Sequence, residues 1–460
     1  MLINGNWIER EDLEVINPYT LEVIRKIPAL SRDEVREAID IACSCKEDMK
    51  KLSITKRFNI LMYIAKKIKE KKEELAKLLA IDAGKPIKQA RVEVNRSIET
   101  FRSAAFYVKE FRNEVIPSDR LIFTRREPIG LVGAITPFNF PLNLSAHKIA
   151  PAIAVGNSIV HHPSPKAPLV CIELAKIIYE AFKKYNAPLG GYNLLTGLGE
   201  VVGEEIVVND KVDMISFTGS IKVGEMILEK AKKKVCLELG GVNPNIVLAD
   251  ADIERAVDSL VKGSFIYSGQ VCISVGKIIV DESIADKFIK LFLEKTKKLN
   301  VGDPLNEKTD LGPVISLEHA KWVEELINKA IEEGAELLLG GKRVKAVVYP
   351  TVLKVDNDNI ICNTETFAPI APIVVANEEH MLDYANSEYG LHAAVFTRDI
   401  NKALYFAENL DYGGVIINDS SLYRQDNMPF GGIKKSGLGR EGVRYAMEEM
   451  SYIKTVVINK

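Results

Sequence analysis

From residue 129 onward, short apolar runs alternate with amphipathic segments of helical periodicity. Short apolar runs bounded by turn residues are typical of buried strands, and strands that alternate with helices predict a parallel sheet covered by helices. The expected strands of a first unit are residues 129–135, 158–161, 192–195, 214–217 and 246–248. A second alternation follows, with expected helices at 253–267, 284–299 and 317–333 and expected strands at 277–280 and 393–396. The chain of 460 residues is therefore expected to form two α/β units in tandem.

The first third of the chain is expected to be mainly helical. Ser31 and Glu34 have the spacing of a capping box, and a helical pattern covers residues 53–84. Two further segments, residues 121–126 and 455–458, look like exposed strands outside the main sheets. Because uncovered edge strands often pair with another subunit, these segments predict a homo-oligomer.

Composition argues against several classes of function. The chain has 61 Lys and Arg against 63 Asp and Glu, so its net charge of −2 gives no electrostatic reason to bind nucleic acid or a membrane surface. The most apolar region, residues 129–160, is interrupted by prolines, histidine and lysine and is too broken to span a bilayer. The six cysteines include no C-x-x-C pair, so we expect reduced thiols and no metal site. No secretory leader is visible, and the expected location is cytoplasmic.

Two glycine-bearing turns are candidates for phosphate binding. In Met214-Ile-Ser-Phe-Thr-Gly-Ser220 a strand enters a turn, and Ser220 is expected to cap a helix over residues 221–233. A helix amino terminus at this point is a ready site for a pyrophosphate, although a plain strand-turn-helix connection is the more common explanation. The turn at residues 197–203 misses the G-x-G-x-x-G spacing by one residue, so an ordinary Rossmann fingerprint is not present.

Three polar residues are candidates for catalysis. Cys272 lies in a glycine-bearing loop between a helical pattern and a strand, where it is either a nucleophile or a buried structural cysteine. Glu238 is a single acid in an apolar run, where burial would raise its pKa toward that of a general base, unless it is ion-paired. Asn139 stands between two prolines, where its amide is either a rigid hydrogen-bond donor or a turn former.

Taken together, these segments resemble the aldehyde dehydrogenase superfamily over nearly the whole chain. The resemblance implies an α/β fold with two Rossmann-like domains and a small β oligomerisation element. It implies an NAD(P)-binding domain at residues 1–115 and 133–240, a catalytic domain at 241–428 and a bridging element at 116–132 and 429–460, assembled as a homodimer or homotetramer. The motifs are Pro137-Phe-Asn-Phe-Pro141, Phe217-Thr-Gly-Ser220, Leu237-Glu-Leu-Gly-Gly241, Gly269-Gln-Val-Cys272, Glu365-Thr-Phe-Ala-Pro369 and Pro429-Phe-Gly-Gly-Ile-Lys-Lys-Ser-Gly-Leu-Gly-Arg-Glu441.

The resemblance also implies the roles of the three candidates. The thiolate of Cys272 adds to the aldehyde carbonyl, and the Asn139 amide and the Cys272 backbone N–H stabilise the resulting oxyanion. Hydride leaves to a nicotinamide, and Glu238 activates the water that hydrolyses the thioester. No metal is needed. An alternative is an acylating enzyme that passes the acyl group to coenzyme A, and another is a structural protein that has kept the fold.

The cofactor expected from the resemblance is NAD, with NADP not excluded. The family usually has a lysine and an acid for the adenine ribose where this chain reads His162-Pro-Ser-Pro165. A carboxylate there repels a 2′-phosphate, so its absence leaves NADP permitted. The cofactor residues implied by the resemblance are Ile135, Thr136, Pro137, Phe138, His162, Ser164, Gly197, Phe217, Gly219, Ser220, Val223, Leu239, Glu365 and Phe367.

Residues 137–144 and 442–450 resemble two branches of the family, one that oxidises lactaldehyde and one that oxidises glyceraldehyde 3-phosphate without phosphorylation. The phosphate-handling branch tends to carry Arg before the nucleophile, where this chain has Val271. We therefore expect a small uncharged hydroxyaldehyde, with lactaldehyde first and glyceraldehyde 3-phosphate as the alternative. Oxidation to lactate would suit deazaflavin-coenzyme biosynthesis. The candidate substrate residues are Arg96, Val271, Tyr423 and Arg424.

Overall fold

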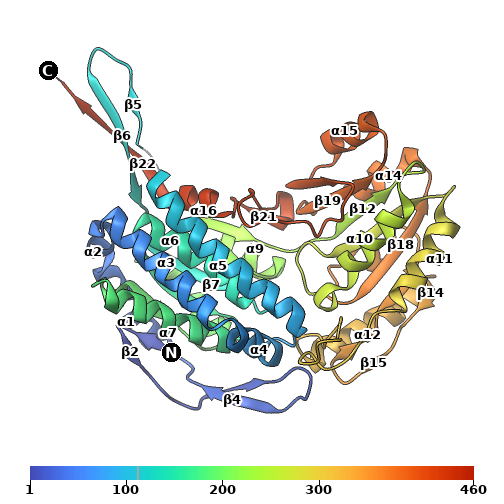
Figure 1. Cartoon of the computed structure of the whole chain (residues 1–460), viewed down its shortest axis with the longest axis horizontal. Coiled ribbons are helices and arrows are strands. Elements are labelled where there is room, and N and C mark those ends of the chain that lie inside the picture. The colour runs from blue at the N-terminus through green and yellow to red at the C-terminus, as the bar shows by residue number, and fades with distance from the viewer. Residues whose placement is uncertain (111–112, 460) are drawn as a thin grey trace.

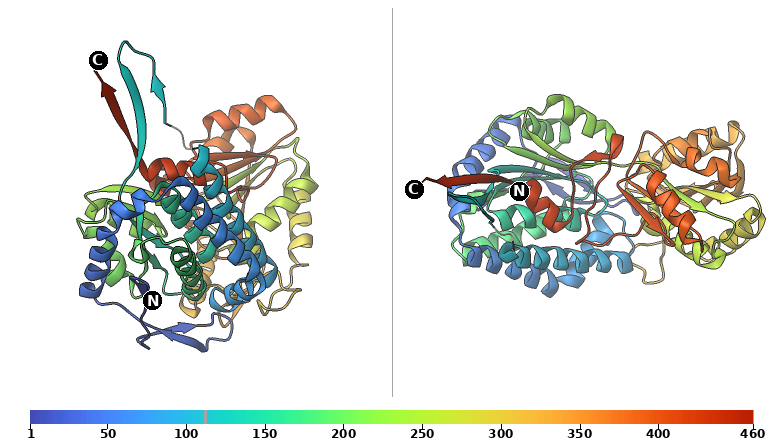
Figure 2. Two further views of the ribbon diagram at one scale, coloured as in Figure 1. Left: turned by 60° about the vertical axis from the view of Figure 1, so that its left-hand side comes forward. Right: turned by 90° about the horizontal axis from the view of Figure 1, so that it is seen from above.

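The computed structural model describes residues 1–110 and 113–459. Residues 111–112 and 460, which fall within the expected NAD(P)-binding and bridging ranges, lie outside the described residues. Figure 1 shows two α/β units side by side and a narrow arm that stands away from the first unit. Figure 2 shows the same arrangement from two other directions. The expected α/β fold with two sheets in tandem is confirmed.

The first unit is built on a sheet with the strand order β2-β1-β9-β8-β7-β10-β11-β21. The strands from β9 to β11 are parallel to their neighbours, whereas β1, β2 and β21 pair antiparallel at the edges. Parallel strands end at the same edge, so the residues that follow β7, β10 and β11 lie close together. The bounds are β1 Leu2–Ile3, β2 Asn6–Trp7, β7 Leu131–Thr136, β8 Ser158–Pro163, β9 Tyr192–Leu194, β10 Met214–Thr218, β11 Lys234–Glu238 and β21 Gly437–Leu438.

Helices cover both faces of this sheet (Figure 2). Along β7, Val132 and Ala134 belong to one apolar cluster, while Leu131 and Ile135 belong to another, as the alternation of side chains along a strand requires. The helices of this unit are α1 Arg32–Ser44, α2 Lys46–Lys51, α3 Ile54–Glu70, α4 Lys72–Asp82, α5 Ile87–Glu110, α6 Pro141–Val155, α7 Leu169–Lys184, α8 Glu204–Val208, α9 Ile221–Lys230 and α16 Val443–Glu449.

The amino-terminal helices start where the sequence predicts. The capping box of Ser31 and Glu34 is confirmed at the start of α1, and the Ser53 hydroxyl accepts a hydrogen bond from the Lys56 amide at the start of α3. The helical pattern over residues 53–84 is two helices, α3 and α4, that meet at Lys71.

The second unit contains a sheet with the order β14-β17-β18-β13-β12-β19-β20, parallel except for the pairing of β14 with β17. The run at residues 246–248, expected in the first sheet, belongs to β12 of this one, which corrects the prediction. The bounds are β12 Asn243–Val247, α10 Ile253–Phe265, β13 Val275–Asp281, α11 Ala285–Thr296, α12 Leu317–Glu332, β14 Glu336–Leu339, β17 Thr351–Lys354, α13 Ile360–Asn363, β18 Ile370–Ala376, α14 Glu378–Ala385, β19 His392–Phe396, α15 Ile400–Asn409 and β20 Gly414–Ile417.

The arm is a three-stranded antiparallel sheet in the order β22-β6-β5, and the carboxyl terminus lies at its tip (Figure 1). Its strands are β5 Val115–Ile116, β6 Leu121–Pro128 and β22 Ser451–Ile458, which include both segments expected as exposed strands. β21 lies in the range expected for the bridging element but pairs with β11 of the first sheet. The remaining strands form two hairpins, β3 Leu13–Ile16 with β4 Val23–Ile27, and β15 Arg343–Val344 with β16 Val347–Val348. Among the described residues, no helix is both long and apolar enough to cross a membrane.

Candidate active site

The loop that carries Cys272 lies between α10 and β13 and has an uncommon backbone. Tyr267, Ser268 and Gly269 have φ values of 50°, 54° and 71°, so three consecutive residues are left-handed. A Cβ atom at Gly269 would lie 2.1 Å from the carbonyl oxygen of Ala368, and this position therefore requires glycine. Residues with positive φ held in a fixed geometry are typical of functional loops.

Two amide side chains hold this loop in place. The Nδ2 of Asn243, at the start of β12, donates to the carbonyl oxygens of Cys272 and Ser274 at 2.9 and 2.8 Å. The Nδ2 of Asn139, in the turn after β7, donates to the carbonyl oxygen of Gln270 at 3.0 Å. An amide nitrogen carries two hydrogens, so one N–H of Asn139 remains for another acceptor near Cys272.

One cavity, of about 200 Å³, opens at the carboxyl ends of β7, β10 and β11. It brings together the three catalytic candidates and much of the candidate cofactor set. Its lining residues are Pro137, Phe138, Asn139, Leu144, Thr218, Gly219, Ser220, Glu238, Leu239, Gly240, Cys272, Glu365 and Phe367.

A second cavity, of about 310 Å³, lies on the other side of Cys272. Cys272 and Leu144 line both cavities, so the thiol stands where the two meet. Three of the candidate substrate residues, Arg96, Val271 and Arg424, are on its wall. A cofactor in the first cavity and an aldehyde in the second would both reach Cys272. We therefore call the first the candidate cofactor cavity and the second the candidate substrate cavity, or the cofactor cavity and the substrate cavity for short.

Tyr423, the fourth candidate substrate residue, lines neither of these cavities. Its side chain is exposed, and its hydroxyl accepts a hydrogen bond of 2.7 Å from the Nε2 of Gln425. The neighbouring Leu422 is on the cavity wall instead, because successive side chains here point in different directions. Tyr423 is therefore the candidate substrate residue that the structure places away from both cavities.

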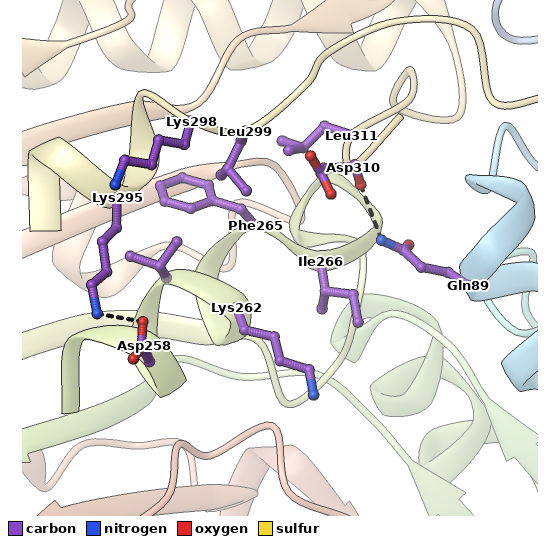
Figure 3. Close-up of a pocket in the computed structure, with 11 residues that line it drawn as sticks. Gln89, Asp258, Lys262, Phe265, Ile266, Lys295, Lys298, Leu299, Asp310 and Leu311 are labelled. Carbon is purple, nitrogen blue, oxygen red and sulfur yellow. Dashed lines mark hydrogen bonds and ion pairs between the residues drawn. The ribbon is translucent and has the colours of Figure 1, made fainter. Parts of the chain in front are cut away.

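Gln89, Lys262 and Ile266 line both the substrate cavity and a wider surface pocket of about 520 Å³. Figure 3 shows that pocket, with Asp310 bonded to Gln89 and with Lys262 extending away from the other labelled side chains. Lys262 is exposed, and its side chain forms no ion pair or hydrogen bond with any of the described residues. The shared lining shows that this pocket adjoins the substrate cavity.

The two candidate arginines are each paired with a carboxylate. Arg96 donates to Asp426 at 2.7 and 3.1 Å, and the same carboxylate lies 2.9 Å from the Nε2 of His147. Arg424 lies 3.4 Å from Glu441, and the Nε of Arg424 has no hydrogen-bond partner among the described residues. Most of the positive charge of the substrate cavity is thus already neutralised by protein carboxylates.

Glu238 ends β11 and is buried, and neither carboxyl oxygen has a hydrogen-bond partner in the described part of the chain. Burial raises the pKa of Glu238 well above its usual value, and the neighbouring negative charge of Glu441 acts in the same direction. Arg424 and Lys148 act against this shift. A buried carboxyl without partners on the cavity wall is suited to bind and deprotonate a water molecule.

The surroundings of Cys272 disfavour its thiolate. Burial raises its pKa to about 12, while the positive charge of Arg424 works in the opposite direction and Glu238 adds to the increase. Free cysteine has a pKa of about 8.5, so this environment favours the neutral thiol. Among the described residues, the positive charge of Arg424 favours the thiolate.

The amino terminus of α9 fits a pyrophosphate. The Ser220 side chain makes no capping hydrogen bond, which corrects the prediction that it caps the helix and leaves first-turn amides available to an anion. A Cβ atom at Gly219 would lie 2.4 Å from the ring of Phe217, so the chain turns closely over that ring. Val223 is exposed and is not on the cavity wall, unlike Ser220.

The far end of the cofactor cavity is closed by a carboxyl group and two rings. A Cβ atom at Gly240 would lie 1.8 Å from the Oε1 of Glu365, so the acid sits directly over this glycine. Burial raises the pKa of Glu365 to about 7, opposed by the backbone N–H of Gly241. Phe138 and Phe367 meet edge to face with centroids 5.9 Å apart. This end of the cavity offers two aromatic walls and the acid Glu365, which fits a nicotinamide ring and its ribose.

The remaining cofactor candidates line neither cavity. The ring of His162 is buried, its Nδ1 is 2.9 Å from the carbonyl oxygen of Leu195, and burial lowers its pKa so that it is neutral. The backbone N–H of Ser164 donates to the carbonyl oxygen of Thr136 at 2.9 Å. The candidates outside both walls are Ile135, Thr136, His162, Ser164, Gly197, Phe217 and Val223.

Several site residues are absent from the sequence prediction. Lys85 and Glu93 line the substrate cavity, and Asp426 and Glu441 pair with its arginines. No local pattern marks Asp426, because its partner Arg96 lies 330 residues away in the chain. Lys148 was visible only as a charge inside an apolar run, and the structure shows that it donates to Glu441 at 2.7 Å. Among the described residues, no cluster of three His, Cys, Asp or Glu side chains could hold a metal ion.

Comparison with known proteins agrees with this geometry. The aldehyde dehydrogenase family matches residues 7–456. Lactaldehyde dehydrogenase of Methanocaldococcus jannaschii is 76% identical over the whole of both chains, and that of Methanococcus aeolicus is 58% identical over the same share. A crystal structure of glyceraldehyde-3-phosphate dehydrogenase GapN from Methanocaldococcus jannaschii with NADP is 76% identical, covers 98% of this chain and 100% of its own, and has a TM-score of 0.98. The site has a thiol at the junction of two cavities, beside an amide and a buried acid, and the family match covers nearly the full length. The chain therefore belongs to the aldehyde dehydrogenase family.

Proposed function

We propose that this aldehyde dehydrogenase oxidises a short hydroxyaldehyde, lactaldehyde first, to its carboxylic acid with NAD or NADP. The observation that carries the proposal is the position of Cys272, which lines both the candidate cofactor cavity and the candidate substrate cavity. The relatives named lactaldehyde dehydrogenase support the choice of substrate. The lactate formed would serve deazaflavin-coenzyme biosynthesis, a role that rests on the resemblance alone.

The first chemical step belongs to Cys272. Its sulfur attacks the carbonyl carbon, and the thiol proton is released to solvent, so that Glu238 stays free for the second step. The free N–H of the Asn139 amide and the Cys272 backbone N–H bind the oxyanion, and each such donor contributes about 3 kcal/mol when it is preorganised. When bound, the nicotinamide supplies the acceptor for the hydride that leaves the thiohemiacetal carbon.

The second step belongs to Glu238. The carboxylate removes a proton from a water molecule, whose oxygen attacks the thioester carbon. The C–S bond then breaks, the acid leaves, and the Cys272 sulfur takes back a proton. Glu238 suits this role because both its oxygens are free of protein hydrogen bonds within the described residues and can therefore accept one from water.

The cofactor side favours NADP at least as much as NAD. At the position expected for the adenine ribose, the chain has His162 and Pro165 in place of a lysine and an acid. This segment contains no carboxylate, so none of its side chains repels a 2′-phosphate. The structure of the 76% identical neighbour with NADP supports this reading.

Glyceraldehyde 3-phosphate is the second candidate substrate, because Lys262 stands unpaired at the rim of the substrate cavity and because the GapN neighbour is named for that substrate. Lactaldehyde is preferred because Arg96 and Arg424 are both held by carboxylates and Val271 offers no guanidinium. A phosphate would have to displace one of these ion pairs.

Initial rates on lactaldehyde and glyceraldehyde 3-phosphate, each with NAD and NADP, test the proposal. We expect higher kcat/KM for lactaldehyde and measurable turnover with both cofactors. The matched variant Val271→Arg places a guanidinium beside the thiol and should shift the preference at least tenfold toward the phosphate substrate. A wild-type preference for glyceraldehyde 3-phosphate would overturn the choice of lactaldehyde, and a requirement for coenzyme A would overturn hydrolysis.

We also propose that the arm joins copies of this chain into a dimer or tetramer in the cytoplasm. Its apolar side chains Val115, Leu121, Ile453 and Val457 are between 48% and 73% exposed, although each belongs to a regular strand. One edge of β22 is unpaired among the described residues. Exposed apolar strands of this kind usually pair with another chain. The six unpaired thiols agree with a reducing compartment.

Light scattering tests the role of the arm. The double variant Ile453→Lys and Val457→Lys should reduce the molar mass toward that of one chain, because charges oppose burial of the strand. Ile400→Lys, which changes an exposed apolar residue of α15 away from the arm, is the matched control and should keep the wild-type mass. An unchanged mass in the double variant would show that the arm does not hold the subunits together.

A further inference from the structure

We propose that Lys85 is a positioning residue that fixes the Asn139 turn against the Cys272 loop across the junction of the two α/β units. The inference rests on the proposed function, in which Asn139 and Cys272 act together. Lys85 lies between α4 and α5 and its side chain is buried, which is rare for lysine. Neither of the two chemical steps above uses it.

The ammonium group of Lys85 lies between two aromatic rings from different parts of the site. Its Nζ is 3.6 Å from the centroid of the Phe140 ring and 4.5 Å from that of Tyr267. Phe140 follows Asn139 directly, and Tyr267 opens the left-handed stretch that leads to Cys272. The two rings also meet edge to face with centroids 6.0 Å apart. A desolvated cation between two rings attracts both, so Lys85 draws the two segments together.

An ion pair fixes the position of the ammonium group itself. Lys85 donates to the Oε2 of Glu93, and both side chains are buried. The other oxygen of Glu93 accepts the backbone N–H groups of Leu142 and Asn143 at 3.0 and 3.2 Å, in the first turn of α6. These amides would otherwise lack partners at the helix start. Glu93 therefore ties Lys85 to the helix that begins just after Asn139.

The Cys272 loop is tied back to the Lys85 segment from the opposite side. The Tyr267 hydroxyl donates to the carbonyl oxygen of Ala83 at 2.8 Å. The amide of Asn139 donates to the carbonyl oxygen of Gln270 at 3.0 Å, so the Asn139 turn and the Cys272 loop are also bonded directly to each other. The separation between the oxyanion donor and the nucleophile is thus set by a closed ring of contacts with Lys85 at its centre.

Energetics favour positioning over stability as the purpose of this pair. Removing two charges from water costs free energy, and replacing a buried ion pair by neutral groups of similar shape is often neutral for stability. Removing only one partner leaves an uncompensated charge and destabilises the fold. The informative change is therefore the double variant Lys85→Met with Glu93→Gln, in which the new side-chain amide oxygen can still accept from the first turn of α6.

Steady-state kinetics of this double variant test the proposal. We expect kcat to fall at least tenfold, while KM for the aldehyde and for NADP stays within threefold of the wild type. Lys88→Met is the matched control, because Lys88 is a nearby, partly exposed lysine that pairs with Asp310 and touches neither ring. Unchanged kcat would overturn the proposal. Because Lys85 also lines the substrate cavity, a rise in KM alone would make it a substrate contact and would overturn positioning as well.

A structural readout separates this proposal from the proposed function. In crystal structures, the distance from Asn139 Nδ2 to the Gln270 carbonyl oxygen should lengthen in the double variant and stay near 3.0 Å in Lys88→Met. The expected change in this distance does not depend on which aldehyde the wild type prefers. The test therefore remains valid if lactaldehyde proves not to be the substrate. If the double variant does not fold, Phe140→Leu removes one ring and keeps the ion pair. It should show the same fall in kcat, and wild-type kcat there would overturn the proposal.

Discussion

Cys272→Ala is expected to abolish aldehyde-dependent NAD(P)H formation, by at least about 10³-fold in kcat. The thiol is the one nucleophilic side chain that lines both cavities, and without it hydride would have to leave a carbonyl carbon that carries no tetrahedral oxyanion. Alanine removes only the sulfur of a partly buried side chain, so the fold should persist. Initial rates and the thermal unfolding midpoint, measured on the same preparation, check both statements.

Cys43→Ala is the control for this change. Cys43 is another partly buried free thiol, on α1 and remote in sequence from the loop, and its loss should leave the rate unchanged. Appreciable turnover by Cys272→Ala would remove the proposed nucleophile. A wild-type protein that bound cofactor but turned over no aldehyde would favour the alternative of a structural protein that has kept the fold.

Glu238→Gln is expected to separate the two chemical steps. Acylation of Cys272 should still release about one equivalent of NAD(P)H per site in a burst, after which steady-state turnover falls by about 10² to 10⁴-fold. Glutamine has nearly the shape of glutamate but cannot take a proton from water, so the thioester accumulates. Rapid-mixing absorbance at the reduced-nicotinamide band measures the burst, and mass spectrometry of the quenched protein detects the acyl group on Cys272.

The control is Glu388→Gln, an exposed acid that pairs with Lys435 on the surface and should leave both phases unchanged. Loss of the burst itself in Glu238→Gln would mean that the acid is needed before acylation, as the acceptor of the thiol proton. Full steady-state turnover would show that another group activates the water.

Much of the fold could be predicted because the pattern that specifies it is local. Apolar runs such as residues 158–161 and 214–217 are buried on both faces, and a strand of that kind carries its signature in its own sequence. β11 was not predicted because it begins with Lys234 and ends with Glu238, so its apolar stretch is short. The prediction for residues 246–248 placed them in the wrong sheet, because the sequence of a strand does not show which other strands it pairs with.

The site residues also fall into those that the local sequence could predict and those that it could not. Cys272, Glu238 and Asn139 stood out because each is polar in an apolar or glycine-rich setting, and the structure brings all three to one cavity. Asp426 and Lys85 did not stand out, because what distinguishes them is a partner far away in the chain or buried beside them in the fold. Tyr423 is exposed and lines neither cavity, because a sequence pattern does not show which of two adjacent loop side chains turns inward.

If the arm joins subunits as proposed, its strand order links the timing of assembly to synthesis of the chain. Its middle strand, β6, is made before either sheet is complete, but its partner β22 is made only after both units, at residues 451–458. Domains generally fold in order as they leave the ribosome, so β6 must wait with one edge uncovered. A nascent or truncated chain that lacks residues 451–458 therefore has no finished arm to offer another subunit. In the proposed oligomer, the order in which the strands are made therefore disfavours mixed assemblies of whole and incomplete chains.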